Sequence, residues 1–206
     1  MQRRLLAVLA FLVLTASLNS PALAQGVAKW TPDKPGSDNI EVLAHLPLGP
    51  RLNVSDIEVE QELDRPYAYV GRMVYGTEGE RGTDIIDISD PRNPKVIHRW
   101  RIENQDLHLG TGAMDVKYFK WDGRYYVVQS LQFRQGGPDA DLGAVVLDVT
   151  DLPEKYTEVA RIRAPEHPGG FHNIFMYKHS NGRPLLFTTV GGPYAYVYDM
   201  AHVVEG

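Results

Sequence analysis

The sequence predicts an all-β fold made of four-stranded antiparallel units, and the first observation behind this prediction is a recurring hairpin. Apolar β-branched residues and then a polar turn with two prolines occupy 84–94, and a second strand pattern runs over 95–100. The same pattern returns at 143–162, where Asp148 takes the position of Asp87. A hairpin that recurs at long spacing indicates a repeat protein.

The second observation is a different hairpin, which occurs three times and supplies the other two strands of each unit. Each copy has a short strand, a polar turn rich in Asp, Asn, Gly or Pro, and then an aromatic or β-branched strand. The three copies span 55–73, 114–131 and 172–190. Aligned residues at the head of the first strand are spaced by 59 and 58 positions and are Asp56, Asp115 and Asn173.

Four strands at a period of about 50–60 residues are typical of a β-propeller. We expect blades at approximately 52–102, 112–163 and 170–206, which is about two and a half blades. A propeller needs about four or more blades to close, and an open arc exposes blade faces and an edge strand. We therefore expect 40–206 to be a truncated, N-terminal portion of a propeller that lacks about three to five blades.

A further strand pattern precedes the first blade. Residues 40–46 resemble the outer strand of each hairpin, with Val42 in the position of Val96 and Val159. Closed propellers commonly begin out of phase in this way, so we expect 40–46 to be an outer strand that completes the last blade.

The first 24 residues have the features of a signal peptide. Arg3 and Arg4 precede an apolar run over 5–14, and a small-residue pattern ends at Ala24, after which we expect cleavage. The apolar run is too short to span a bilayer, and we expect no transmembrane segment in the mature chain. Residues 25–39 read as a flexible leader. These features predict export to the periplasm, the cell surface or the medium.

The amino-acid composition bears on the kind of partner that the protein could bind and on what stabilises its fold. Loss of Arg3 and Arg4 leaves 19 basic residues against 26 acidic ones, a net charge of −7, which argues against nucleic acid as a partner. The chain has no cysteine, so a hydrophobic core and not disulfides must stabilise it outside the cell.

The hairpin at 84–95 also resembles a known repeat. Its order of an apolar run, Asp87, an apolar residue, Ser-Asp-Pro, a polar gap and Pro94 is similar to the LVIVD repeat. The copy at 145–159 is looser, because Leu152 and Pro153 replace the Asp-Pro step. This resemblance implies an exported bacterial seven-bladed propeller of a family whose activity is generally unassigned.

Histidines are the candidate metal ligands. His172 heads an innermost strand at the expected rim of the central channel, and His108 and His167 lie on loops that enter such strands. Imidazoles from several blades could bind a divalent transition metal such as Zn, Cu or Fe. Only His172 occupies the repeat position, so a loop histidine that bonds to backbone is the simpler interpretation.

Aspartates offer weaker candidates. Asp56, Asp115 and Asn173 could line the channel mouth, although a role in turns is favoured. Two carboxylates at 139–141 could offer oxygens to Ca²⁺, although a solvated turn is favoured there. Asp87 and its repeats are interpreted as caps of turns.

The sequence indicates the function of the protein less clearly than its fold. Catalytic residues are unknown, because the sequence has no GxSxG elbow, no HExxH and no phosphate-binding glycine loop, and no cofactor is established. The first hypothesis is a non-catalytic exported propeller that presents a surface or channel to an unknown protein or small ligand. The alternative is a metal-dependent, histidine-ligated enzyme, such as an oxidoreductase, and a third is a structural protein of the cell surface.

Overall fold

The computed structural model describes residues 40–49, 54–74, 79–104, 111–133, 136–137 and 139–206. Residues 43–206 form one compact unit. The expected signal peptide and leader and His108 lie outside the described residues. In the described part of the chain, no helix has the length and the hydropathy to cross a membrane.

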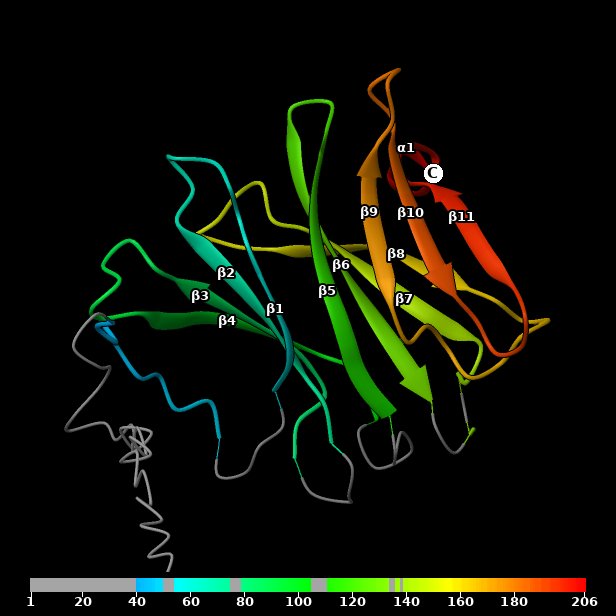
Figure 1. Ribbon diagram of the computed structural model, residues 1–206, viewed down its shortest axis with the longest axis horizontal. Helices are drawn as coiled ribbons and strands as arrows, with labels where there is room; N and C mark the ends of the chain where they lie inside the picture. Colours follow the sequence, from blue (N-terminus) through cyan, green and yellow to red (C-terminus); the bar gives the residue numbers. More distant parts are fainter. Residues whose placement is uncertain (1–39, 50–53, 75–78, 105–110, 134–135, 138) are drawn as a thin grey trace, which may run out of the picture. The chain divides into compact units, whose positions relative to one another are not determined.

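The unit is all-β, as predicted, and consists of three open antiparallel sheets (Figure 1). Sheet 1 contains β1 (Val54–Val59), β2 (Tyr67–Arg72), β3 (Gly82–Asp87) and β4 (Lys95–Arg101). Sheet 2 contains β5 (Thr111–Trp121), β6 (Arg124–Phe133), β7 (Leu142–Asp148) and β8 (Thr157–Arg163). Sheet 3 contains β9 (Ile174–Lys178), β10 (Pro184–Thr189) and β11 (Ala195–Asp199). Strands follow chain order within every sheet, so each is built from hairpins.

Strand register makes the three sheets equivalent position by position. The second strand begins its pairing with the third strand through the pairs Tyr67–Asp87, Tyr126–Asp148 and Leu185–Asp199. Each of these aspartates accepts a hydrogen bond from the backbone N–H two residues later, with N···O distances of 2.8, 2.9 and 3.1 Å. The predicted cap is thus confirmed in all three sheets, and it exists because a short carboxylate reaches the next backbone donors.

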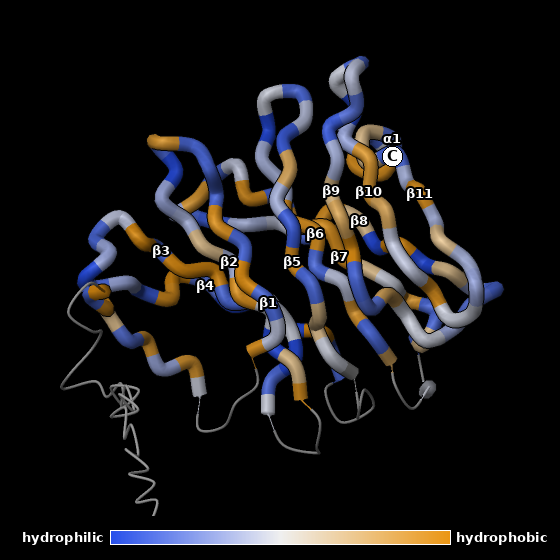
Figure 2. The backbone as a smooth tube through the Cα atoms, viewed as in Figure 1, coloured by the Kyte–Doolittle hydropathy of each residue, from blue (hydrophilic) through white to orange (hydrophobic). Residues whose placement is uncertain are grey.

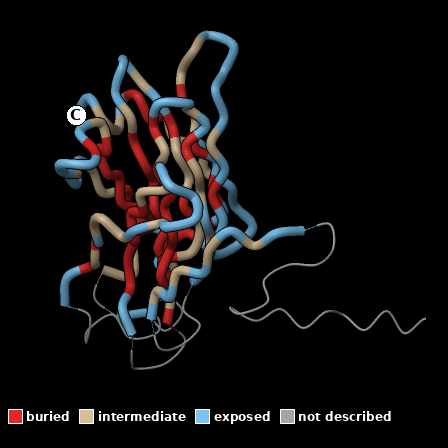
Figure 3. The backbone as a smooth tube through the Cα atoms, turned by 90° about the vertical axis from the view of Figure 1, so that its left-hand side faces the viewer, coloured by how far each residue is buried: buried red, intermediate tan, exposed pale blue. Residues whose placement is uncertain are grey.

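Apolar faces pack between neighbouring sheets. One buried cluster joins Tyr69 and Ile85 of sheet 1 to Val127 and Val145 of sheet 2. A second cluster joins the other face of sheet 2 to sheet 3. Figure 2 shows that hydrophobic residues concentrate along the strands, and Figure 3 shows that the buried positions run through the inside of the unit. Sheet 2 is therefore covered on both faces.

One local expectation differs from the structure. Ile40 forms a single bridge and residues 41–49 form no strand, so the strand expected over 40–46 is wrong for this chain. A strand requires a neighbour for its backbone groups, and no described strand pairs with this segment. A short helix, α1 (Met200–Glu205), follows β11 and forms because Asp199 caps it and Met200 and Ala201 are buried.

Candidate functional site

The predicted aspartates join consecutive sheets. Asp56 accepts hydrogen bonds from the backbone N–H of Val116 at 3.1 Å and from Lys117 Nζ at 2.5 Å. One repeat later, Asp115 accepts from the backbone N–H of Ile174 at 3.0 Å and from Asn173 Nδ2 at 3.3 Å. Both lie at a bulge in the first strand, which turns the side chain toward the next sheet. These carboxylates therefore serve as links between sheets and not as caps of turns.

An arginine recurs at one repeat position, and only its first copy reaches another sheet. Arg65, Arg124 and Arg183 each lie two residues before the aligned start of the second strand. Arg124 and Arg183 form ion pairs with the capping aspartate of their own sheet. Arg65 instead binds Glu60, with Nε–Oε2 and Nη2–Oε1 distances of 2.6 and 3.1 Å.

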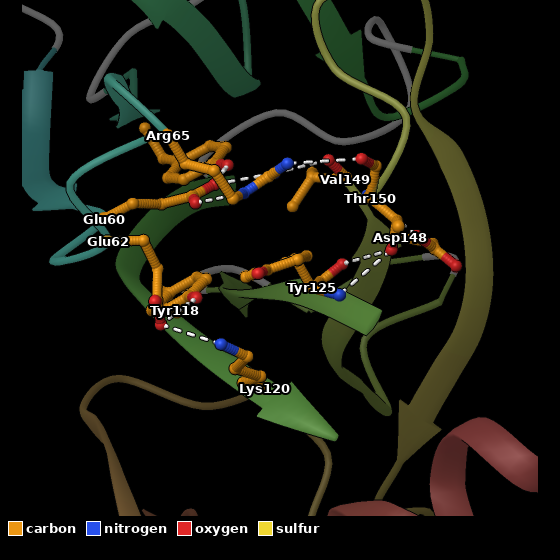
Figure 4. Close-up of polar contacts among 10 residues, drawn as sticks. Glu60, Glu62, Arg65, Tyr118, Lys120, Tyr125, Asp148, Val149 and Thr150 are labelled. Carbon is orange, nitrogen blue, oxygen red and sulfur yellow. Dashed lines mark hydrogen bonds and ion pairs between the residues drawn. The ribbon is translucent and has the colours of Figure 1, made fainter. Parts of the chain in front are cut away.

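Arg65 also reaches across to sheet 2 (Figure 4). Its Nη2 and Nη1 donate to the carbonyl oxygens of Val149 and Thr150 at 2.8 and 3.2 Å. Its guanidinium carbon lies 4.0 Å from the ring centroid of Tyr125. Burial opposes the charged form, but the hydrogen bond and charge of Glu60 raise the pKa of Arg65. A permanently charged guanidinium thus clamps the first two sheets.

Glu62 extends this network toward the tip of the β5–β6 hairpin. Its Oε1 accepts from Tyr118 Oη and from Lys120 Nζ, both at 3.3 Å (Figure 4). Burial first, and then the nearby Glu60 and Glu62 carboxylates, raise the pKa of the Tyr118 phenol. Tyr118 therefore stays a neutral donor, which suits a structural contact.

The side chains that alternate with Tyr118 and Lys120 face the opposite way, toward sheet 3. There a cavity of about 440 Å³, which we call the hairpin pocket, lies between the tips of the β5–β6 and β9–β10 hairpins. Its lining includes Phe119, Trp121, Asp122, Met176, Lys178 and Pro184. Residues two apart on a strand share a face, so Phe119 and Trp121 form one wall and Met176 and Lys178 the other.

The lining of this pocket combines an aromatic wall with the cation of Lys178. Trp121 Nε1 donates to Glu205 Oε1 of α1 at 2.9 Å, which orients the indole ring. The guanidinium carbon of Arg183 lies 5.4 Å from the indole centroid, and Arg183 Nη2 is buried without a hydrogen-bond partner in the described structure. Lys178 is exposed and forms no ion pair with the described residues. The pocket can therefore hold a flat apolar group next to a negative charge.

His172 lies away from this pocket, at the opposite end of sheet 3. It is exposed, and its Nδ1 is 2.8 Å from Oε1 of Gln132. A smaller cavity of about 260 Å³ adjoins both residues and several glycines. Nowhere among the described residues do three His, Cys, Asp or Glu side chains gather as a metal site. The ligand role of His172 stays a prediction.

The other candidate carboxylates have an arginine partner. Arg163 donates to Asp141 at 2.7 Å and to Asp139 at 2.9 Å. The guanidinium cation of Arg163 thus already lies between the two carboxylates considered for Ca²⁺.

His167, another candidate metal ligand, contacts the rings of Tyr194 and Tyr196, with centroid distances of 4.6 and 5.7 Å.

Sequence reasoning missed the hairpin pocket. The sequence feature that could have indicated it is the pair of hairpin tips at which β5 ends with Trp121 and β9 ends with Lys178. These residues do not align with one another in the repeat, so inspection of the repeats alone could not select them.

Comparison of the sequence with protein-family models and with curated proteins gives no match. The resemblance of 84–95 to the LVIVD repeat and the expected export remain predictions.

Proposed function

We propose that this protein is an exported, non-catalytic binding protein of the β-propeller type, whose hairpin pocket takes a small organic anion with a flat ring. The aromatic and cationic lining of that pocket carries the proposal. Repetition of the Asp56–Val116 link at Asp115–Ile174 supports the propeller part, because it relates consecutive sheets by the same contact.

The size and chemistry of the pocket favour a small molecule. Ligand pockets typically occupy about 300–1,000 Å³, and the hairpin pocket lies within this range at about 440 Å³. Phe119, Trp121 and Met176 supply apolar surface for a ring, and the exposed Lys178 supplies positive charge. A ligand that carries both features satisfies the two halves of the site at once.

Benzoate is a suitable probe, because it combines a flat ring with one carboxylate. We expect titration with benzoate to shift the NMR signal of the Trp121 indole N–H, and calorimetry to give saturable binding. Benzamide has the same ring without the charge and is expected to bind more weakly by about fivefold, the factor that corresponds to one exposed charge contact of about 1 kcal/mol.

Two lysine variants separate the pocket from general surface charge. Lys178→Gln should weaken benzoate binding by about fivefold and leave benzamide binding unchanged. Lys95→Gln removes an exposed lysine on β4, far along the chain from the pocket, and should change neither. Equal affinities for benzoate and benzamide, or equal effects of the two variants, would refute the assignment.

A further inference from the structure

Two hairpin tips bring side chains of opposite charge to the hairpin pocket. Asp122 lies in the turn between β5 and β6, and Lys178 is the last residue of β9. Both line the cavity of about 440 Å³, so one small molecule in this cavity reaches both. The β5–β6 and β9–β10 hairpins end at the same end of sheets 2 and 3 (Figure 1), and the cavity walls come from these two hairpins.

Among the described residues that line this cavity, three carry a charge, and one of the three already has an anionic partner. Lys120 Nζ lies 3.3 Å from Oε1 of Glu62 and 4.9 Å from the ring centroid of Tyr125, so its charge is directed toward sheet 1. Asp122 and Lys178 are exposed, and neither forms an ion pair with the residues that the structure describes. The cavity therefore presents one negative and one positive charge to a ligand.

The charged groups beside the aromatic wall also have partners. Arg183, whose guanidinium lies over the Trp121 ring, forms an ion pair with Asp199. Glu205 accepts the hydrogen bond from Trp121 Nε1. These contacts hold the indole in place and leave the charges of Asp122 and Lys178 as those that a ligand can meet.

Apolar surface lies between the two charges. Phe119 stacks on Tyr126, with ring centroids 5.1 Å apart and planes 18° apart, and only 6% of Phe119 is exposed. Trp121 and Met176 are half-buried and line the same cavity. A ring placed there loses contact with water while charged groups beside it stay at the rim.

The turn explains why Asp122 is short and polar but not why it is charged. Asp122 and Gly123 have φ values of +47° and +72°, as a two-residue turn of type I′ requires. Asparagine suits the first position of such a turn as well as aspartate does. The carboxylate of Asp122 is thus available for a role other than the turn.

We propose that the ligand of the hairpin pocket is an aromatic amino acid, with its ring on Trp121 and Met176, its carboxylate at Lys178 and its ammonium group at Asp122. This inference rests on the proposed function and narrows it, because the carboxylate bound by Lys178 then belongs to a molecule that also carries a positive charge. A ligand with a carboxylate alone places a second negative charge in the cavity with Asp122, and like charges in one site oppose binding. An amino acid gives each of the two charges an opposite partner.

Three probes with the same ring test the assignment. Phenylalanine carries a carboxylate and an ammonium group, phenylpropionate carries the carboxylate alone, and phenylethylamine carries the ammonium group alone. We expect calorimetry to show that phenylalanine binds more tightly than either of the other two by about fivefold, the factor that corresponds to one exposed charge contact.

Charge-removing variants assign each group of the ligand. Asp122→Asn keeps the turn and should weaken phenylalanine binding by about fivefold without weakening phenylpropionate binding. Lys178→Gln should weaken the binding of both carboxylates and leave phenylethylamine unchanged. Asp64→Asn is the matched control, because Asp64 is exposed in the corresponding β1–β2 turn of sheet 1, and it should bind all three probes normally. Thermal melts establish that every variant is folded.

The outcomes separate this inference from the proposed function. Phenylalanine that binds no more tightly than phenylpropionate, or an Asp122→Asn variant that keeps the preference for phenylalanine, would overturn the amino-acid assignment. Benzoate has no ammonium group, so its binding is independent of Asp122. If benzoate binds as expected while phenylalanine shows no preference, the amino-acid assignment alone fails; if neither compound binds, the proposed function fails with it.

Discussion

Replacement of Arg65 by alanine tests the view that one buried guanidinium holds sheets 1 and 2 together. The Glu60 side chain has no exposed surface, and that of Arg65 is 10% exposed. Removal of Arg65 leaves a buried carboxylate without its cation and removes the guanidinium donors to the carbonyl oxygens of Val149 and Thr150. Of these two oxygens, that of Val149 still accepts from the backbone N–H of Leu152 at 3.3 Å. Breaking a buried ion pair in this way typically costs about 3–5 kcal/mol.

The repeat supplies a matched control at the same position of the next sheet. Arg124 binds Asp148, but its side chain is 52% exposed, so Arg124→Ala should cost about 1 kcal/mol or less. Urea unfolding followed by the fluorescence of Trp100 measures both variants, because Trp100 is buried in the cluster between sheets 1 and 2. With a typical urea dependence, a loss of 3–5 kcal/mol lowers the midpoint by about 2 M.

Equal midpoints for Arg65→Ala and Arg124→Ala would refute this reasoning. They would mean that burial and the contacts to sheet 2 add nothing to a surface ion pair. Should Arg65→Ala fail to fold, Arg65→Lys retains the charge but not the forked geometry, and an intermediate midpoint is expected for it.

Three further predictions concern backbone and charge. Gly170→Ala should lower the free energy of unfolding in urea by at least about 3 kcal/mol, because φ is +72° and an added Cβ would lie 2.0 Å from the carbonyl oxygen of Leu131. Gly123 has the same φ but open space around it, so Gly123→Ala should cost only about 1 kcal/mol. Asp115→Ala should cost about 1–3 kcal/mol, since it leaves the buried N–H at the head of β9 without its acceptor, and an unchanged midpoint would contradict the inter-sheet link. The ion pair with Arg183 lowers the pKa of Asp199. The contribution of this carboxylate to stability is therefore complete above its ordinary pKa of 3.8 and is lost as the pH falls below that value. The melting temperature should drop on acidification, and it should drop by less in Asp199→Asn.

Much of the fold was accessible from sequence because its signals are local. The alignment of Asp56 with Asp115 matches the observed register, and the cap made by Asp87 recurs in every sheet. Alternation, turn residues and a side-chain bond to a donor two positions away all involve neighbours in the chain. They are therefore visible without knowledge of packing.

The partners of the same residue types could not be predicted in this way. Arg65 and Arg124 occupy the same repeat position. Arg65 nevertheless contacts Val149 and Thr150, which lie 84 and 85 residues farther along the chain, whereas Arg124 contacts Asp148 of its own sheet. The difference arises because Glu60, at the position of Phe119, offers a buried carboxylate only in sheet 1. The hairpin pocket likewise requires two hairpin tips to meet from different sheets.

The sequence by itself determined the strands, their order in hairpins and the turn caps, because these depend on residues a few positions apart. Only the tertiary structure decided which carboxylates link sheets, where Trp121 and Lys178 share a cavity, and that 41–49 forms no strand. Those outcomes depend on which faces and edges meet across the molecule. A face without a covering sheet leaves apolar residues such as Phe187 exposed, even though their equivalents elsewhere in the chain form the core.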